Sequence, residues 1–282
     1  VDDNLVIIGG YEIEDLDGDK SKDEFGYFII NIDKNHEIAE ERFFPYDIYS
    51  NVTWQSSIID HEGFLIMNFM KMDRIIYNQT GQRSLLPVLN KIDLTTGEII
   101  WESVYGEARY ERYPDRAQAI VESHDKNGYI VVGTSESSNG DISENNGWND
   151  IWIIKLNEIG DIEWEKSFGN SGADYLDELE PASDGGSFVV VEYGNGGSIC
   201  LTFNDRDGYD LYKLSDMGSI VWQNEFAAGS EGSTSHGKIL ETSNGGCITD
   251  RFYSHFVGGL FDECQYPGPT QMFNNLGIET EY

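Results

Sequence analysis

The residues best suited to chemistry in this 282-residue sequence form a short acidic stretch near its start. Oxygen-bearing side chains alternate along it, at Asp15, Asp17, Asp19, Ser21 and Asp23. Calcium takes about six to eight oxygen ligands, and alternating oxygen side chains around Gly18 let a short loop supply them. The glycine is not where an EF-hand needs it, and no helical pattern flanks the stretch. The pattern predicts a calcium-binding loop, with a solvated acidic loop as the alternative.

Two further loops, at residues 139–145 and 204–210, carry oxygen-rich side chains at lower density. In the first, Asp141, Ser143 and Glu144 follow Asn139, and side-chain hydrogen bonds within Asx turns account for such residues. In the second, Asp207 and Asp210 flank a glycine. A metal ion remains an alternative for both loops.

Catalytic patterns are missing from the sequence. The five histidines are scattered without metal-ligand spacing, there is no Gly-x-Ser-x-Gly elbow, and carboxylates are too numerous for one pair to indicate a glycosidase. We therefore predict no catalytic residues and no cofactor except calcium. A glycan-active enzyme would instead need a channel-facing cluster of carboxylates with perturbed pKa values.

The charge balance narrows the class of partner. Eighteen basic residues face 51 acidic ones, a formal net charge of −33, which disfavours nucleic acid and anionic membranes. Three explanations stay open: an acidic coat for solubility, divalent-cation binding, or a basic partner. No apolar run reaches the roughly 18 residues that span a bilayer. The pairing of Cys200, Cys247 and Cys264 stays undetermined.

One pattern of strands and turns recurs along the chain. Its clearest copy has strands at 117–123, 128–133, 150–156 and 161–169. A glycine opens the second strand of four copies, at Gly63, Gly128, Gly186 and Gly246, and a tryptophan marks the last strand of three, at Trp101, Trp164 and Trp222. Ala39 is assigned to the tryptophan position in the first copy. A period of about 60 residues with four short strands is typical of propeller blades.

The repeats predict an all-β fold, a single β-propeller domain over residues 1–282. Its five blades of about four antiparallel strands have approximate bounds 1–50, 51–106, 107–169, 170–229 and 230–282. Apolar second and third strands indicate burial on both faces. The repeated tryptophans are predicted to pack between neighbouring blades. The copies differ most in the loop between second and third strands, where we expect any specific function to lie.

Several short segments together resemble the β-propeller repeats of secreted Bacteroidota proteins, many of which are exported by the type IX secretion system. They are Asp184-Gly-Gly186, Asn139-Gly-Asp-Ile-Ser143, Asp150-Ile-Trp-Ile-Ile-Lys-Leu156, Gly160-Asp-Ile-Glu-Trp164 and Lys166-Ser-Phe-Gly169. The resemblance implies an extracellular or cell-surface location, often within a larger protein. The sorting domain typical of that route is not evident. The acidic loop at 15–23 is also similar to the calcium loops of integrin-type blades.

The sequence therefore predicts a non-enzymatic, exported binding module that could form part of a larger surface or secretion assembly. Its partner would be a protein or glycan at the cell surface, with no nucleic acid and no transmembrane segment. The alternatives are a glycan-active enzyme on the same scaffold and a purely structural spacer.

Overall fold

The computed structural model of the protein describes residues 5–13, 24–46, 54–72, 85–106, 115–138, 140–194, 208–227, 232–255, 264–267, 271–273 and 279–280. The chain divides into two compact units, Val1–Ala117 and Gln118–Tyr282. Within the described residues, no helix is long and apolar enough to cross a membrane.

The first unit contains two antiparallel sheets whose strands follow chain order. Sheet one consists of β1 (Leu5–Ile13), β2 (Glu24–Ile32) and β3 (Ile38–Tyr46), and sheet two of β4 (Trp54–Ile59), β5 (Phe64–Met72), β6 (Leu85–Asp93) and β7 (Ile99–Val104). Their shared core includes Ile29, Leu65, Met67, Phe69, Val88 and Ile92.

The second unit holds three more sheets, of which the first begins at the unit boundary. Sheet three consists of β8 (Arg116–Glu122), β9 (Tyr129–Ser135), β10 (Asp150–Leu156) and β11 (Ile162–Phe168). Sheet four consists of β12 (Ala173–Pro181), β13 (Ser187–Gly194), β14 (Gly208–Leu214) and β15 (Ile220–Ala227). Sheet five consists of β16 (Gly232–Glu241), β17 (Cys247–His255), β18 (Cys264–Pro267), β19 (Gln271–Phe273) and β20 (Glu279–Thr280).

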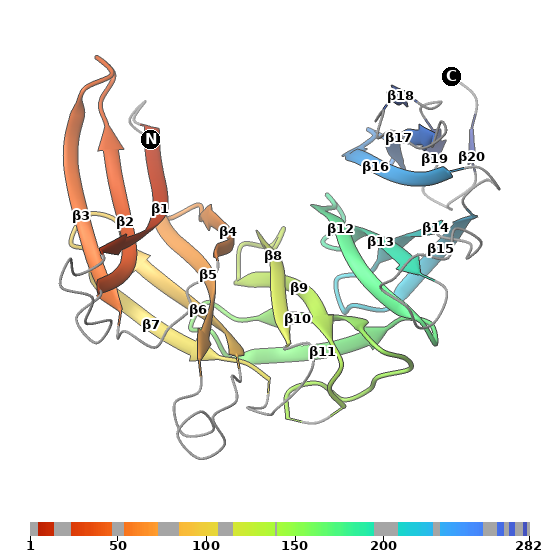
Figure 1. Cartoon of the computed structure of the whole chain (residues 1–282), viewed down its shortest axis with the longest axis horizontal. Helices are drawn as coiled ribbons and strands as arrows, with labels where there is room; N and C mark the ends of the chain where they lie inside the picture. Colours follow the sequence, from red (N-terminus) through yellow and green to blue (C-terminus); the bar gives the residue numbers. More distant parts are fainter. Residues whose placement is uncertain are drawn as a thin grey trace. The chain divides into compact units, whose positions relative to one another are not determined.

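Five successive antiparallel meanders confirm the predicted all-β, β-propeller fold (Figure 1). The described strands number three, four, four, four and five per sheet, close to the predicted four. Each sheet is made of strands that lie near one another in the sequence, as expected for blades whose pairing is local.

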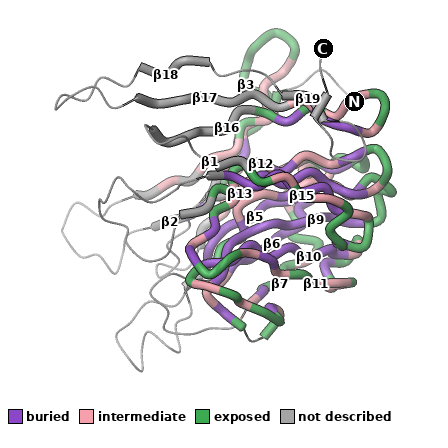
Figure 2. Tube along the Cα trace, turned by 90° about the vertical axis from the view of Figure 1, so that its right-hand side faces the viewer, coloured by how far each residue is buried: buried purple, intermediate pink, exposed green. Residues whose placement is uncertain are grey.

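Burial is concentrated in the middle strands, as their apolar sequences predict. Every residue of β9 and β10 is buried, whereas the edge strand β11 alternates exposed and half-buried positions (Figure 2). Ile153 of sheet three and Val189 of sheet four belong to one core cluster, against which Trp164 packs. Trp222 packs in the same way against the core between sheets four and five. These two tryptophans therefore fill the predicted place between neighbouring blades.

The register between third and fourth strands corrects one assignment. Lys91 pairs with Trp101, Lys155 with Trp164, and Lys213 with Trp222. In sheet one the equivalent pair is Asn31 with Glu40, so Glu40 and not Ala39 occupies the tryptophan position. Ile38 stands two residues before Glu40, just as Ile99 stands two residues before Trp101, so the assignment of Ala39 was one residue too early.

Candidate binding pocket

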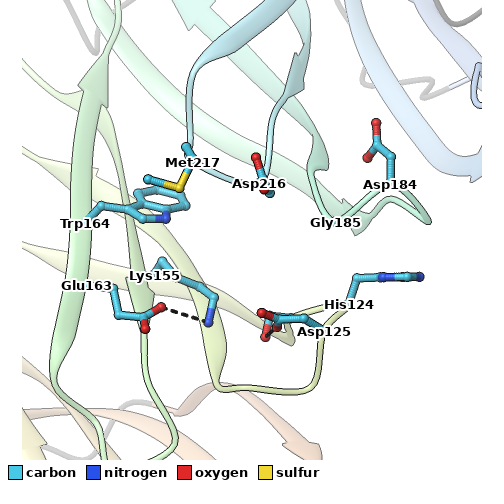
Figure 3. A pocket seen from close by; sticks show the side chains of 10 residues that line it. His124, Asp125, Lys155, Glu163, Trp164, Asp184, Gly185, Asp216 and Met217 are labelled. Atoms are coloured by element: carbon cyan, nitrogen blue, oxygen red, sulfur yellow. Dashed lines mark hydrogen bonds and ion pairs between the residues drawn. The ribbon is translucent and has the colours of Figure 1, made fainter.

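A pocket of about 430 Å³ opens between sheets three and four at the ends of their hairpins. Three turns line it, between β8 and β9, between β12 and β13, and between β14 and β15, together with the end of β10 and the start of β11 (Figure 3). We call it the turn pocket; its lining residues are Ser123, His124, Asp125, Lys155, Glu163, Trp164, Asp184, Gly185, Asp216 and Met217.

The β8–β9 turn presents Asp125 in a fixed, ionised form. The Ser123 hydroxyl donates to Asp125 Oδ1 at 2.6 Å, and the Asn127 backbone N–H donates to the same oxygen at 3.1 Å. These hydrogen bonds, the serine's first, hold the pKa of Asp125 below its usual value even though partial burial opposes them. The carboxylate is therefore charged at neutral pH.

The β12–β13 turn presents a second carboxylate, Asp184. Desolvation pushes the pKa of Asp184 upward, but the Lys213 ammonium at 2.7 Å and the Gly186 N–H at 3.0 Å outweigh it, and the pKa is lowered. Because Lys213 is almost fully buried beneath the turn, its charge is committed to Asp184.

Lys155 is committed in a similar way on the other wall of the pocket. Its Nζ donates to the carbonyls of Asn127 at 3.2 Å and Leu156 at 3.0 Å, and it forms an ion pair with Glu163 at 3.3 Å. Only 7% of its side chain is exposed. This lysine supports the turn backbone and leaves little positive charge for an anionic ligand.

The apolar part of the pocket comes from Trp164 and Met217. Met217 is 60% exposed and lies beside the indole ring (Figure 3). Gly218 next to it has φ +71°, and a Cβ there would approach the indole carbon Cζ3 to 2.4 Å. The turn of sheet four therefore rests directly on Trp164.

The sum of these groups is acidic. Asp125, Glu163, Asp184 and Asp216 face a single lining lysine, and Lys213 lies behind Asp184. In the described part of the chain, no ion pair involves Asp125 or Asp216, although the Lys155 charge also attracts Asp125 and helps to lower its pKa. With a chain net charge of −33, the pocket favours a cationic group beside an aromatic face.

The calcium loop predicted at Asp15, Asp17, Asp19, Ser21 and Asp23 lies outside the described residues. Asp207 also lies outside them, whereas Asp210 is buried in β14. The described residues contain no group of three or more His, Cys, Asp or Glu side chains placed to hold a metal ion. In the loop after β9, Asn145 donates to the Ser135 carbonyl at 2.9 Å and accepts from Gly147 at 3.1 Å, the local bonding expected of Asx turns.

The turn pocket itself was not predicted from the sequence. Its residues come from turns that join first to second and third to fourth strands, whereas function was expected in the loops between second and third strands. An acidic residue recurs in these turns, at Glu62, Asp125, Asp184 and Asp216. That recurrence was the available signal, although hairpin chemistry explains it equally well.

No known family pattern and no curated protein sequence matches this chain. Among solved structures, it is similar to a GH93 α-L-arabinofuranosidase of Fusarium graminearum in complex with arabinobiose, with TM-score 0.46, 9% identity and coverage of 97% of this chain and 82% of that one. A member of the DUF4221 family from Bacteroides vulgatus is similar with TM-score 0.40 and 10% identity, and the match covers 96% of this chain and 97% of that one. A mutant levansucrase of B. megaterium is similar with TM-score 0.37 and 10% identity, and the match covers 95% of this chain and 83% of that one. Similarity at this level carries nothing about substrate or activity.

Proposed function

We propose that the protein is a binding module whose turn pocket receives a positively charged side chain of a protein partner. The observation that supports this most directly is the uneven pairing of charges. Lys155 and Lys213 are already bound to carboxylates, while Asp125 and Asp216 have no ion pair in the described residues. A ligand ammonium or guanidinium would meet these carboxylates and the Trp164 ring together.

The size of the pocket fits a side chain and a short stretch of backbone. Its volume of about 430 Å³ lies in the range of about 300–1,000 Å³ usual for ligand pockets. Its walls are hairpin turns closed by backbone hydrogen bonds, among them Ser123 N to Gly128 O at 2.9 Å and Gly218 N to Ser215 O at 3.0 Å. The carboxylates therefore stand on ordered turns, which limits the entropy lost on binding.

The binding experiment follows the indole N–H signal of Trp164, identified by its absence in Trp164→Phe. N-acetyl-lysine amide and N-acetyl-arginine amide are titrated, with N-acetyl-glutamine amide as the neutral probe and a maltooligosaccharide as the glycan probe. Cationic probes should shift the signal, and added salt should weaken them. Asp216→Asn should raise their Kd about three- to tenfold, since one charge contributes about 1 kcal/mol at a partly exposed site. Asp161→Asn, an exposed turn residue outside the pocket, is the matched control.

The outcomes separate the candidates. A signal that moves equally with the glutamine probe, or with none, contradicts a cation pocket. A shift with the oligosaccharide alone would show that the pocket binds a glycan and not a cationic side chain. A protein that responds to no probe and no macromolecular partner would fit the spacer alternative.

One observation favours the glycan-active enzyme as a second candidate. Asp177 is exposed on β12, yet desolvation, followed by repulsion from Glu178, raises its pKa to about 6. A carboxyl with such a pKa is suited to general acid catalysis near neutral pH. Turnover of aryl glycosides by the wild type, lost in Asp177→Asn, would establish this candidate, and absence of turnover over a broad panel would remove it.

We also propose that the protein is exported and acts at the cell surface, as the acidic coat and the resemblance to secreted propeller repeats suggest, and that calcium binds the loop at residues 15–23. Protease treatment of intact cells tests the location. The protein should be degraded while cytoplasmic markers survive, and full protection of the protein would contradict export.

A further inference from the structure

Three carboxylates are buried at the ends of strands opposite to the turn pocket. Asp150 begins β10, Asp174 is the second residue of β12, and Asp210 lies near the start of β14. Their residues are exposed by only 1%, 2% and 9%. Buried acids normally have a cationic partner. In the described part of the chain, no Lys, Arg or His pairs with any of the three.

Asp150 and Asp174 each close a loop. The Asn146 backbone N–H donates to Asp150 Oδ2 in a short hydrogen bond, and the Asn170 N–H donates to Asp174 Oδ2 at 2.9 Å. The Asn170 side-chain amide also donates to Asp174 Oδ1 at 2.9 Å. Both acids therefore anchor loop backbone at the start of a strand.

The two closed loops are joined to each other. Trp148 N donates to Gly172 O at 2.9 Å, and Asp174 N donates to Asn149 O at 2.7 Å. Asn149 and Ala173 form a parallel β-bridge. The loop between β9 and β10, which carries the half-exposed Trp148, is thus docked on the segment that connects sheet three to sheet four.

The two carboxylates face the same small space above Gly169. A Cβ on Gly169 would lie 2.6 Å from Asp150 Oδ1 and 2.7 Å from Asp174 Oδ2, so these oxygens cannot be farther apart than those two distances together. Asp150 Oδ1 is buried and has no hydrogen-bond partner. Two facing carboxylates, one with an unsatisfied oxygen, cannot both carry charge without a large penalty.

The groups that face this pair from the neighbouring strands are acidic as well. Asp210 accepts from Tyr212 Oη at 2.9 Å and Gln223 Nε2 at 2.8 Å, while its Oδ1 has no partner, and Glu225 repels it from β15. Desolvation first, and then Asp150 and Asp210, raise the pKa of Asp174 to about 6 against the opposing Asn170 hydrogen bond. Burial also raises the pKa values of Asp150 and Asp210.

We propose that Asp150 and Asp174 share one proton, and that this carboxyl–carboxylate pair is an acid-operated latch holding the Trp148 loop on the segment after β11. The proton supplies the missing donor between the two facing oxygens. When it leaves, two like charges remain in one buried space and push the loop away from its dock. The latch closes in mildly acidic surroundings and loosens as the pH rises.

The direction of the pH effect follows from linkage. The folded-state pKa of Asp174 lies above its unfolded value of 3.8, so the folded protein binds the proton more tightly. Stability contributed by the pair therefore increases as the pH falls through about 6 and is complete below the unfolded value. For one such group the unfolding equilibrium constant falls about tenfold between about pH 7.5 and about pH 5.

The decisive measurement is a ¹³C NMR titration of the aspartate carboxyl carbons in the wild-type protein. We expect the pair to titrate with one apparent pKa near 6 and the other well below it, as coupled acids do. Titration of both groups below about 4.5 would overturn the latch. This measurement needs no variant, so it stands even where a substitution prevents folding.

The variant that mimics the closed latch is Asp150→Asn, since its amide can donate permanently to Asp174 Oδ2. The pH effect on unfolding should be clearly smaller than in wild type, because the Asp150 charge is gone and its amide favours ionised Asp174, while the control Asp161→Asn keeps the tenfold effect. Self-repulsion of the acidic surface changes in all three proteins and cancels in the comparison. Hydrogen exchange at the Trp148 and Asp174 amides should slow at low pH in wild type, after correction for intrinsic rates, but not in Asp150→Asn. Equal pH dependence in wild type and Asp150→Asn would contradict the proposal.

Discussion

Gly218 shows how a single residue couples the pocket to the packing of two sheets. Its backbone is left-handed, with φ +71°, and its missing Cβ leaves room for the Trp164 ring. A side chain at this position meets both backbone strain and the indole, whereas Gly63, with φ +89°, has nothing within 4 Å of its Cβ position. Substitution of Gly63 therefore introduces backbone strain alone, whereas substitution of Gly218 adds a steric clash with Trp164.

We predict that Gly218→Ala destabilises the protein more than Gly63→Ala does. A left-handed alanine lowers the free energy of unfolding by about 1–2 kcal/mol in both variants. In Gly218→Ala the displacement of Trp164 lowers it by about 1–3 kcal/mol more. Thermal unfolding of the two variants measures the difference, and the Trp164 indole signal should shift only in Gly218→Ala. If the two variants are equally stable, the turn does not rest on the ring as tightly as described.

At the scale of the strand, one lysine recurs near the end of the third strand of three sheets. Lys91, Lys155 and Lys213 are buried in the same register, but their partners differ in exposure. Asp60, bound to Lys91 at 3.1 Å, is 1% exposed in its side chain, whereas Glu163 and Asp184 are 48% and 62% exposed. Removing Lys91 therefore leaves the buried Asp60 behind, together with the exposed Glu62, whereas removing Lys155 or Lys213 leaves only an exposed carboxylate.

We predict that Lys91→Met costs more stability than Lys155→Met or Lys213→Met. Methionine keeps much of the apolar stem, so the main loss is the charge. A carboxylate left buried without its cation costs about 3 kcal/mol, while an exposed one is solvated and costs about 1 kcal/mol or less. Unfolding midpoints of the three variants give the ranking, and equal losses would show that partner burial does not set the cost.

The elements that the sequence predicts well are those with local causes. The glycine-opened hairpins, the apolar middle strands and the packing of Trp164 and Trp222 follow from turn chemistry and periodicity within about 60 residues. The turn pocket and the Asp150–Asp174 pair join side chains from different turns or sheets. Among 51 acidic residues, no rule of spacing distinguishes the buried ones. Only the packing of sheet three on sheet four brings them together.

At the scale of the whole molecule, a net charge of −33 opposes compactness through self-repulsion. Any salt relieves part of that repulsion, because the Debye length shortens to about 10 Å at roughly 0.1 M. A stabilising effect of calcium therefore indicates a specific site only when ionic strength is held constant and a second divalent ion is compared. Magnesium serves, since it holds its water more tightly and demands a stricter octahedral geometry.

We predict that calcium, and not magnesium, raises the melting temperature at constant ionic strength, and that a chelator reverses the rise. The loop with Asp15, Asp17, Asp19, Ser21 and Asp23 offers the oxygens that calcium needs. Binding to the folded state alone stabilises that state in proportion to the logarithm of one plus the ratio of free calcium to Kd. Asp17→Asn combined with Asp19→Asn should abolish the calcium effect, while Asp161→Asn, also a charge removal, should keep it. A rise that magnesium reproduces, or that survives the double substitution, would assign the effect to screening of the acidic surface and leave the loop solvated.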